Sequence, residues 1–167
     1  MLNKKLFRTV KIAIMGLLIV ASASVAAKQG HIKFSSHAYK VISVKNAQGQ
    51  MTQKLIPAKK VLPGEIVQYT NTFENISKES ANHIGVTNPI PQHTVYIPNS
   101  ANNKNFDIVY SVDGGKHWGK PSTLKVKGKD GKMRPAKASD YTHIRWKYKS
   151  SLKPGEKKSV SYQVRLL

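Results

Sequence analysis

The chain of 167 residues contains no cysteine and only 8 acidic residues. The absence of cysteine excludes disulfides, thiol chemistry and cysteine-ligated metal sites. A folded domain of this sequence must therefore be held together by packing and hydrogen bonds alone. The scarcity of Asp and Glu argues against catalysis by two carboxylates that converge in one cleft. The Gly-x-Ser-x-Gly pattern of many hydrolases is absent as well. We predict no enzymatic activity, no catalytic residue and no cofactor.

The N-terminus has the three parts of an export signal. It begins with a basic segment, whose charges come from Lys4, Lys5, Arg8 and Lys11. The apolar run Ile12–Val20 follows, and Ala21–Ala27 supplies small residues. We predict a signal-peptide helix, residues 1–27, that is cleaved after Ala26 or Ala27. The alternative is a retained membrane anchor, but the charge-free stretch has 16 residues, short of the ~20 that a spanning helix needs.

Basic residues dominate the composition, with 28 Lys and Arg against 8 Asp and Glu. Cleavage of the signal removes four of them and leaves 24 basic against 8 acidic residues, a net charge of +16. Such a surface attracts polyanions and stays soluble by self-repulsion. We expect the product in the periplasm or outside the cell, without a transmembrane segment. The partners to consider there are lipopolysaccharide phosphates, anionic lipids, acidic glycans and extracellular DNA, the last without specific recognition. Solubility alone is the competing explanation.

Short alternating segments dominate the chain after residue 27. In Thr142–Tyr148, the side chains of Ile144, Trp146 and Tyr148 share one face, which is the period of a half-buried strand. The same alternation predicts strands near 37–45, 51–59, 65–75, 82–88, 93–97, 106–112 and 159–166. About eight short strands with turns between them are typical of a sandwich or barrel of antiparallel sheets.

The sequence also indicates the turns between these segments. Leu62–Glu65 and Lys153–Glu156 each place Pro-Gly ahead of a strand, which predicts two type II turns. Asn46–Gln50 and Asp113–Gly115 fit hairpin loops. Lys125–Ser139 interrupts the pattern with closely spaced basic residues. We predict that it is a mobile basic loop, although its Lys-Asp-Gly-Lys core can form the tip of a hairpin.

Four stretches in order carry a family resemblance: 61–69 (Val-Leu-Pro-Gly-Glu-Ile-Val-Gln-Tyr), 84–91, 96–100 and 152–164. Together they resemble a bacterial surface-protein repeat, the immunoglobulin-like domain known as domain of unknown function 11. The resemblance covers roughly residues 55–167. One departure is Asn88, which stands where the family usually has Asp.

The resemblance implies an all-β fold, a single immunoglobulin-like antiparallel sandwich of about seven to nine strands. We expect this domain over residues 37–167, after a loose N-terminal lead-in at 28–36. The family has no common catalytic or binding residues to carry over. Its role as a spacer in tandem stalks does not carry over either, because a single copy stands nearly alone here.

Residues 111–118 match the Ser-x-Asp-x-Gly-x-x-Trp pattern of sialidases, called an Asp-box. We interpret its residues as a structural turn, in which the Asp side chain binds turn amides and Gly takes a positive φ. These residues are Ser111, Asp113, Gly115 and Trp118. A sialidase needs a longer propeller with several such boxes and an arginine cluster. Carbohydrate binding through Trp118 is the remote alternative.

The chain has 6 histidines, none of them in a spacing typical of metal ligands. They are His31, His37, His83, His93, His117 and His143. His83 and His93 can approach one another only if their strands pair. We therefore predict no metal site.

The basic loop and the polar face of the strand that follows it are neighbours in sequence. If the loop folds over that strand, they form one polyanion-binding patch. Its members are Lys125, Lys127, Lys129, Lys132, Arg134, Lys137, Arg145, Lys147 and Lys149. Tyr141 at its edge can stack on a base or sugar ring. The alternative is a charged edge that prevents sheet-to-sheet aggregation.

Two hypotheses about function follow for an exported, non-enzymatic module of the cell envelope or exterior. The first is a binder of anionic envelope polymers. The second is a structural subunit that assembles with itself or with a larger surface protein complex, for which edge pairing is one route.

Overall fold

The computed structural model describes residues 32–101 and 103–167, and these form an all-β structure of antiparallel sheets. The elements are β1 (Ile32–Lys45), β2 (Met51–Pro57), β3 (Ile66–Asn75), β4 (Gly85–Pro89), β5 (Thr94–Tyr96), β6 (Phe106–Ser111), β7 (Lys125–Lys127), β8 (Met133–Pro135), the 3-10 turn η1 (Ala138–Asp140), β9 (His143–Tyr148) and β10 (Lys157–Leu166). The predicted signal peptide, with Ala26 and Ala27, lies outside the described residues. Within them, no helix is long and apolar enough to cross a membrane.

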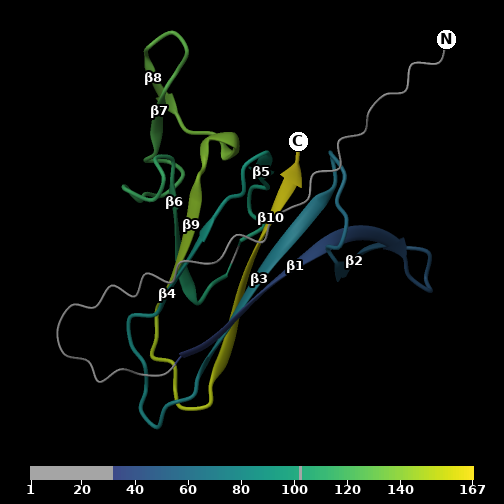
Figure 1. Ribbon diagram of the computed structural model, residues 1–167, viewed down its shortest axis with the longest axis vertical. Coiled ribbons are helices and arrows are strands. Elements are labelled where there is room, and N and C mark those ends of the chain that lie inside the picture. The colour runs from purple at the N-terminus through teal and green to yellow at the C-terminus, as the bar shows by residue number, and fades with distance from the viewer. Residues whose placement is uncertain (1–31, 102) are drawn as a thin grey trace.

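The larger sheet has five strands in the order β2-β1-β3-β10-β5 (Figure 1). Its central strand β3 alternates as the sequence predicts: Val67 and Phe73 are buried and point to the core, whereas Gln68 and Thr72 between them face outward. β10 pairs with β3 along its length, with Tyr162 opposite Tyr69 and the two rings stacked at 5.3 Å. The period of two thus gives this sheet one apolar and one polar face.

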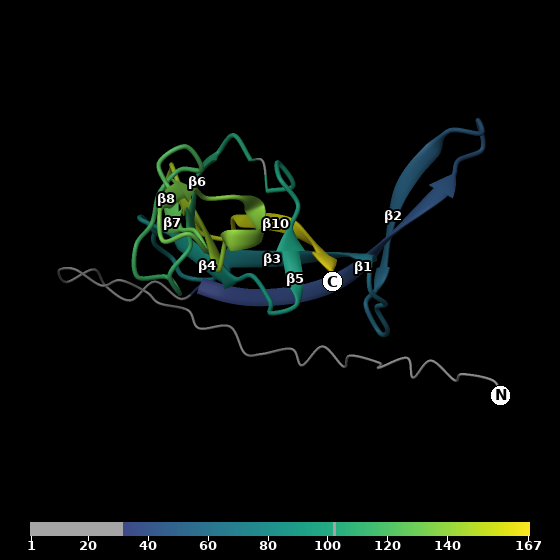
Figure 2. The ribbon, with the colours of Figure 1, turned by 90° about the horizontal axis from the view of Figure 1, so that it is seen from above.

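The smaller sheet has three strands in the order β4-β9-β6 and packs its apolar face on β3 and β10 (Figure 2). Phe73 of β3 meets Phe106 of β6 edge to face at 6.1 Å, and Trp146 of β9 lies 5.8 Å from Tyr162 of β10. Trp146 and Ile144 are fully buried. The core therefore lies between the two sheets and is built from large aromatic side chains.

Both Pro-Gly segments form the turns that their sequence predicts. Gly64 has φ +87° and Gly155 has φ +72°, the positive values that position three of a type II turn requires. The amide of Glu65 donates to Leu62 O at 3.1 Å, and that of Glu156 to Lys153 O at 3.0 Å. Each glutamate side chain also accepts the first amide of its turn. Local sequence therefore determines how β3 and β10 begin.

Two regions differ from the sequence-based expectation. β1 begins at Ile32, inside the expected lead-in at 28–36, because residues 32–36 pair with β3. The segment Lys125–Ser139 is not an unstructured loop: β7 and β8 form a short hairpin, and η1 follows it. Its tip holds Asp130, which accepts the amide of Lys132, and Gly131 at φ +78°. The Lys-Asp-Gly-Lys turn thus closes a hairpin of its own.

β1 is longer than its partners and carries β2 away from the body of the molecule. Residues 32–41 of β1 pair with β3, and residues 39–45 pair with β2. The far part of this pair forms a two-stranded ribbon, residues 42–54, that extends beyond the sandwich (Figure 2). Every residue of β2 except Ile56 is exposed.

Candidate functional site

The Asp-box segment forms a tightly hydrogen-bonded turn after β6. The Asp113 carboxylate accepts the amides of Lys116 at 3.2 Å and His117 at 3.0 Å, and the Ser111 hydroxyl at 2.7 Å. Ser111 Oγ in turn accepts the amide of Gly115 at 2.9 Å. The His117 amide, the His117 ring at 2.6 Å and the Ser111 hydroxyl, in that order, hold the pKa of Asp113 well below its usual range. Ser111, Asp113 and Gly115 of the predicted structural turn are thus hydrogen-bonded within the turn itself.

Trp118 closes this turn against the outer face of β9. The Arg145 guanidinium lies 3.8 Å from the centre of the Trp118 ring, and its Nε donates to Thr87 Oγ1 at 2.8 Å. The ring of His143 meets Trp118 edge-on at 6.2 Å. Burial lowers the pKa of His143, and the neighbouring Arg145 charge lowers it further. One face of the indole is therefore covered by a cation, which leaves that face unable to stack on a sugar ring.

The basic hairpin β7–β8 projects past the end of β9 (Figure 1) and does not lie over it. Its register places Lys125, Lys127 and the exposed Met133 on one face, and Val126 and Arg134 on the other. Arg134 donates to the Asp140 carboxylate through both terminal nitrogens, Nη1 and Nη2, at 2.7 and 2.8 Å. This ion pair fixes the base of the hairpin to η1 and lowers the pKa of Asp140.

The predicted patch is divided into two parts. Lys125, Lys127, Lys129, Lys132 and Lys137 belong to the hairpin and its base, and within the described residues none of them forms an ion pair. The other members lie elsewhere. Arg134 is paired with Asp140, Arg145 lies on Trp118, and Lys149 contacts Asp107 at 3.5 Å. Lys147 is exposed on β9, opposite Gly85 and Asp107.

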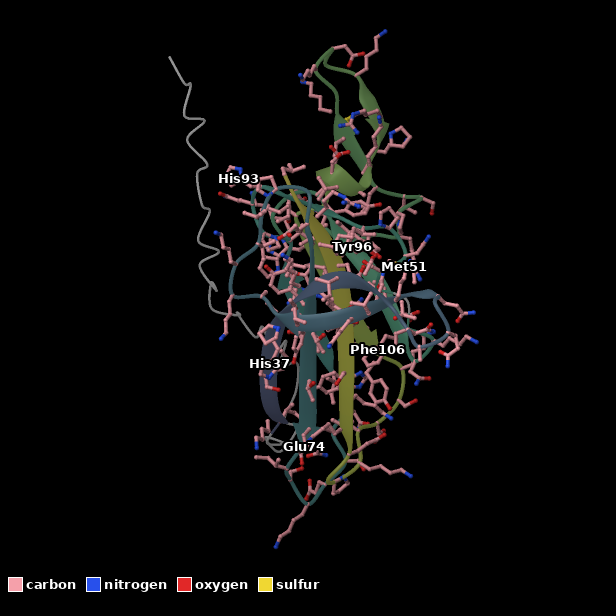
Figure 3. The ribbon with its side chains drawn as sticks, turned by 90° about the vertical axis from the view of Figure 1, so that its right-hand side faces the viewer. His37, Met51, Glu74, His93, Tyr96 and Phe106 are labelled. Atoms are coloured by element: carbon pink, nitrogen blue, oxygen red, sulfur yellow. The ribbon has the colours of Figure 1, made fainter. Side chains whose placement is uncertain are left out.

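A tyrosine-lined cavity of about 160 Å³ lies near the base of the hairpin, between β5, β6 and η1. The Tyr96 and Tyr110 hydroxyls are 2.9 Å apart, and the Tyr141 ring stacks on Tyr110 at 4.7 Å. Tyr96 lies within the body below the hairpin (Figure 3). Tyr141 is buried, so the expectation that it sits at an edge and stacks on a base or sugar is wrong. The alternation of apolar and polar residues in β9 could not predict this burial, because Tyr141 precedes the strand.

The described histidines do not gather into a metal site. Across residues 32–101 and 103–167, no three His, Asp or Glu side chains come together as ligands. His83 and His93 each adopt a positive φ in loops, at 56° and 60°. They do not lie on paired strands. His37 lies on the outer face of β1, with its ring 6.2 Å from Tyr39.

No protein-family model, curated protein or solved structure matches this chain. The feature with the clearest chemical consequence is the β7–β8 hairpin, a projecting element that concentrates lysines without an ion-pair partner in the described part of the chain. In the Asp-box turn, by contrast, the Asp113 carboxylate is hydrogen-bonded within the turn.

Proposed function

We propose that this chain is an exported, non-enzymatic module with an immunoglobulin-like sandwich, which binds anionic components of the cell envelope through its β7–β8 hairpin. Two antiparallel sheets packed face to face around a Trp and Tyr core support the sandwich. The order of Pro-Gly turns and strands supports the likeness to the surface-protein repeat. Export rests on the signal-like N-terminus.

The observation that carries the binding proposal is the charge of the hairpin. Residues 125–140 contain six Lys and Arg against two Asp. One of these acids, Asp140, is taken by Arg134, and the other, Asp130, caps the tip by accepting the Lys132 amide. The lysines at 125, 127, 129 and 132 thus have no ion-pair partner among the described residues and are open to an outside ligand. A projecting hairpin can reach phosphate or sulfate groups of a polymer while the sandwich stays clear of it.

The binding test is retention of the purified protein on immobilised heparin, with lipopolysaccharide co-sedimentation as a second probe. Replacing Lys125, Lys127, Lys129 and Lys132 by Gln removes four charges. We expect the slope of log affinity against log salt to fall by up to about four, because each lost contact releases one fewer counterion.

A matched variant removes the same total charge from other exposed positions. Its substitutions to Gln are at Lys59, Lys60, Lys78 and Lys104. If net charge alone drove retention, the two variants would elute at the same salt concentration. Earlier elution of the hairpin variant supports the proposal. Equal elution, or a flat salt response of the wild type, contradicts it.

A further inference from the structure

One edge strand of the larger sheet is β2, on the ribbon that extends beyond the sandwich. Figure 3 views the molecule from the side on which this ribbon lies, with Met51 labelled. Met51 is 62% exposed and Leu55 is 41% exposed. Long exposed edges are normally blunted by lysine, proline or a bulge, because they template pairing with another chain. Here the edge carries a single lysine, Lys54, and its proline comes only at the last position, Pro57.

The alternation of hydrogen bonds between β1 and β2 shows which backbone groups of the ribbon face outward. The amide of Asn46 donates to Gln50 O at 2.9 Å, and the amide of Ala58 donates to Ala38 O at 3.2 Å. Antiparallel bonding alternates, so the even-numbered residues of β2 bond to β1. The N–H and C=O groups of Met51, Gln53 and Leu55 therefore point away from β1, to the open edge.

We propose that this edge pairs with the same edge of a second copy of the chain, antiparallel and with the two-fold axis at Gln53. Two-fold pairing brings the same patch of both copies together. This register sets Met51 opposite Leu55 of the other copy and Gln53 opposite its equivalent. The Met51–Leu55 pair, its symmetry mate and the Gln53–Gln53 pair are all hydrogen-bonded pairs, in which each partner both donates and accepts. The β2 edges then close into one sheet that is continuous across both copies.

The side chains favour this register over those centred on Lys54 and on Leu55. Met51, Gln53 and Leu55 share a face, so both apolar residues find apolar partners across the axis. On the other face, Lys54 lies opposite Thr52, and no like charges meet. A register centred on Lys54 would place the two lysines directly opposite each other, which is destabilising. A register centred on Leu55 would place Pro57, which has no N–H, opposite Gln53.

The inference is independent of the proposed anion binding, and salt separates the two. The copies carry the same positive charge, so screening by salt should strengthen their association. Salt weakens the binding of a polyanion. A failure of one proposal therefore leaves the other untouched.

The test uses the absence of cysteine in the natural chain, which lets a single introduced thiol report one contact. In the proposed register, Gln53→Cys lies opposite itself and should form an interchain disulfide on mild oxidation. Thr52→Cys and Lys54→Cys are the matched controls. Each is displaced along the strand from its own equivalent, beyond the ~7 Å Cα separation that a disulfide can bridge. Cross-linking of either control in preference to Gln53→Cys overturns the register.

A second variant measures the contribution of the edge without a thiol. Gln53→Pro removes an N–H that β1 does not use, so the fold should survive, with an unchanged circular dichroism spectrum. Two hydrogen bonds are lost per dimer, and we expect the dissociation constant measured by sedimentation equilibrium to rise about thirtyfold. A wild type that stays monomeric up to high protein concentration in high salt overturns the proposal. So does a dimer that Gln53→Pro leaves intact.

Discussion

The side-chain amide of Asn71 on β3 donates to the side-chain oxygen of Asn88 on β4 at 2.7 Å, across the space between the two sheets. Asn71 is 0% exposed and Asn88 is 4% exposed. The Oδ1 atom of Asn71 has no hydrogen-bond partner among the described residues. The bond to Asn88 satisfies the NH₂ group of the buried Asn71 side chain, and losing this bond leaves the Asn71 amide without a partner in an apolar environment.

We therefore expect Asn88→Leu to destabilise the fold by ~1–3 kcal/mol, the cost of leaving a buried polar group without a partner. The double variant Asn71→Leu with Asn88→Leu should recover most of this loss, because no polar atom of the pair is then left behind. Urea unfolding of the two single variants and the double variant measures the coupling free energy. Additive effects of the two substitutions would show that the bond does not link the sheets.

The Arg145–Trp118 contact leads to a second prediction. Arg145→Met keeps an unbranched aliphatic stem but removes the charge over the Trp118 ring and the hydrogen bond to Thr87. We expect a loss of ~0.5–2 kcal/mol of stability and a changed fluorescence of Trp118. The variant Trp118→Phe isolates the signal of Trp146, which is fully buried and serves as the internal control. An unchanged Trp118 emission in Arg145→Met would mean that the guanidinium does not lie on the ring in solution.

Much of the sandwich could be predicted from sequence because its strands alternate strictly. Ile144 and Trp146 are both fully buried, and Arg145 between them is not, so their period already indicates a strand with one face in the core. The Asp-box turn could be predicted for a different reason. Asp113, Ser111 and their partner amides lie within a few residues of one another, so the local sequence contains the whole hydrogen-bond set.

The arrangement of the basic residues could not be predicted in the same way. β7 and β8 have 3 residues each, too few to show a period. Which cations stay free depends on contacts between distant segments: Arg145 reaches Thr87 of β4 and Trp118 beyond β6. The length of β1 beyond β3 also depends on pairing with two different partners. Sequence spacing identifies the charges, whereas tertiary contacts determine which of them a ligand can meet.

A third prediction concerns acid. The depressed pKa of Asp113 means that its carboxylate stabilises the fold at pH values above its unfolded pKa of ~3.9. This contribution is lost as the pH falls through the folded pKa. Asp113→Asn should therefore lower the melting temperature at pH 7, and the difference from the wild type should narrow as the pH drops below ~4. Asp130→Asn, at the hairpin tip, is the matched control. A gap of constant size across this pH range would contradict the ionic origin of the effect.

Alkaline pH gives the last prediction, because the structure buries several tyrosine hydroxyls. Burial raises the pKa of Tyr110 and of Tyr162 far above their usual value, and Tyr96 adds to the rise for Tyr110. Tyr162 also donates to Pro89 O at 2.8 Å. A folded pKa above the unfolded one gives stability that is complete below the unfolded pKa of ~10 and declines as the pH rises past it. Stability should therefore decrease above pH ~10.

The variants Tyr110→Phe and Tyr162→Phe separate this linkage from the packing of the rings. Each removes one titrating group, so the decline of the unfolding free energy above pH ~10 should become shallower. Tyr162→Phe also leaves the Pro89 carbonyl without its donor, which lowers stability at every pH. The test therefore compares how steeply the unfolding free energy falls with pH, not its absolute value. Tyr39→Phe, on the outward face of β1, is the control. If the unfolding free energy declined equally with pH in all three variants and the wild type, the buried hydroxyls would ionise without unfolding the chain. Absorbance at 295 nm, which reports tyrosine ionisation, would then rise before the circular dichroism signal changes.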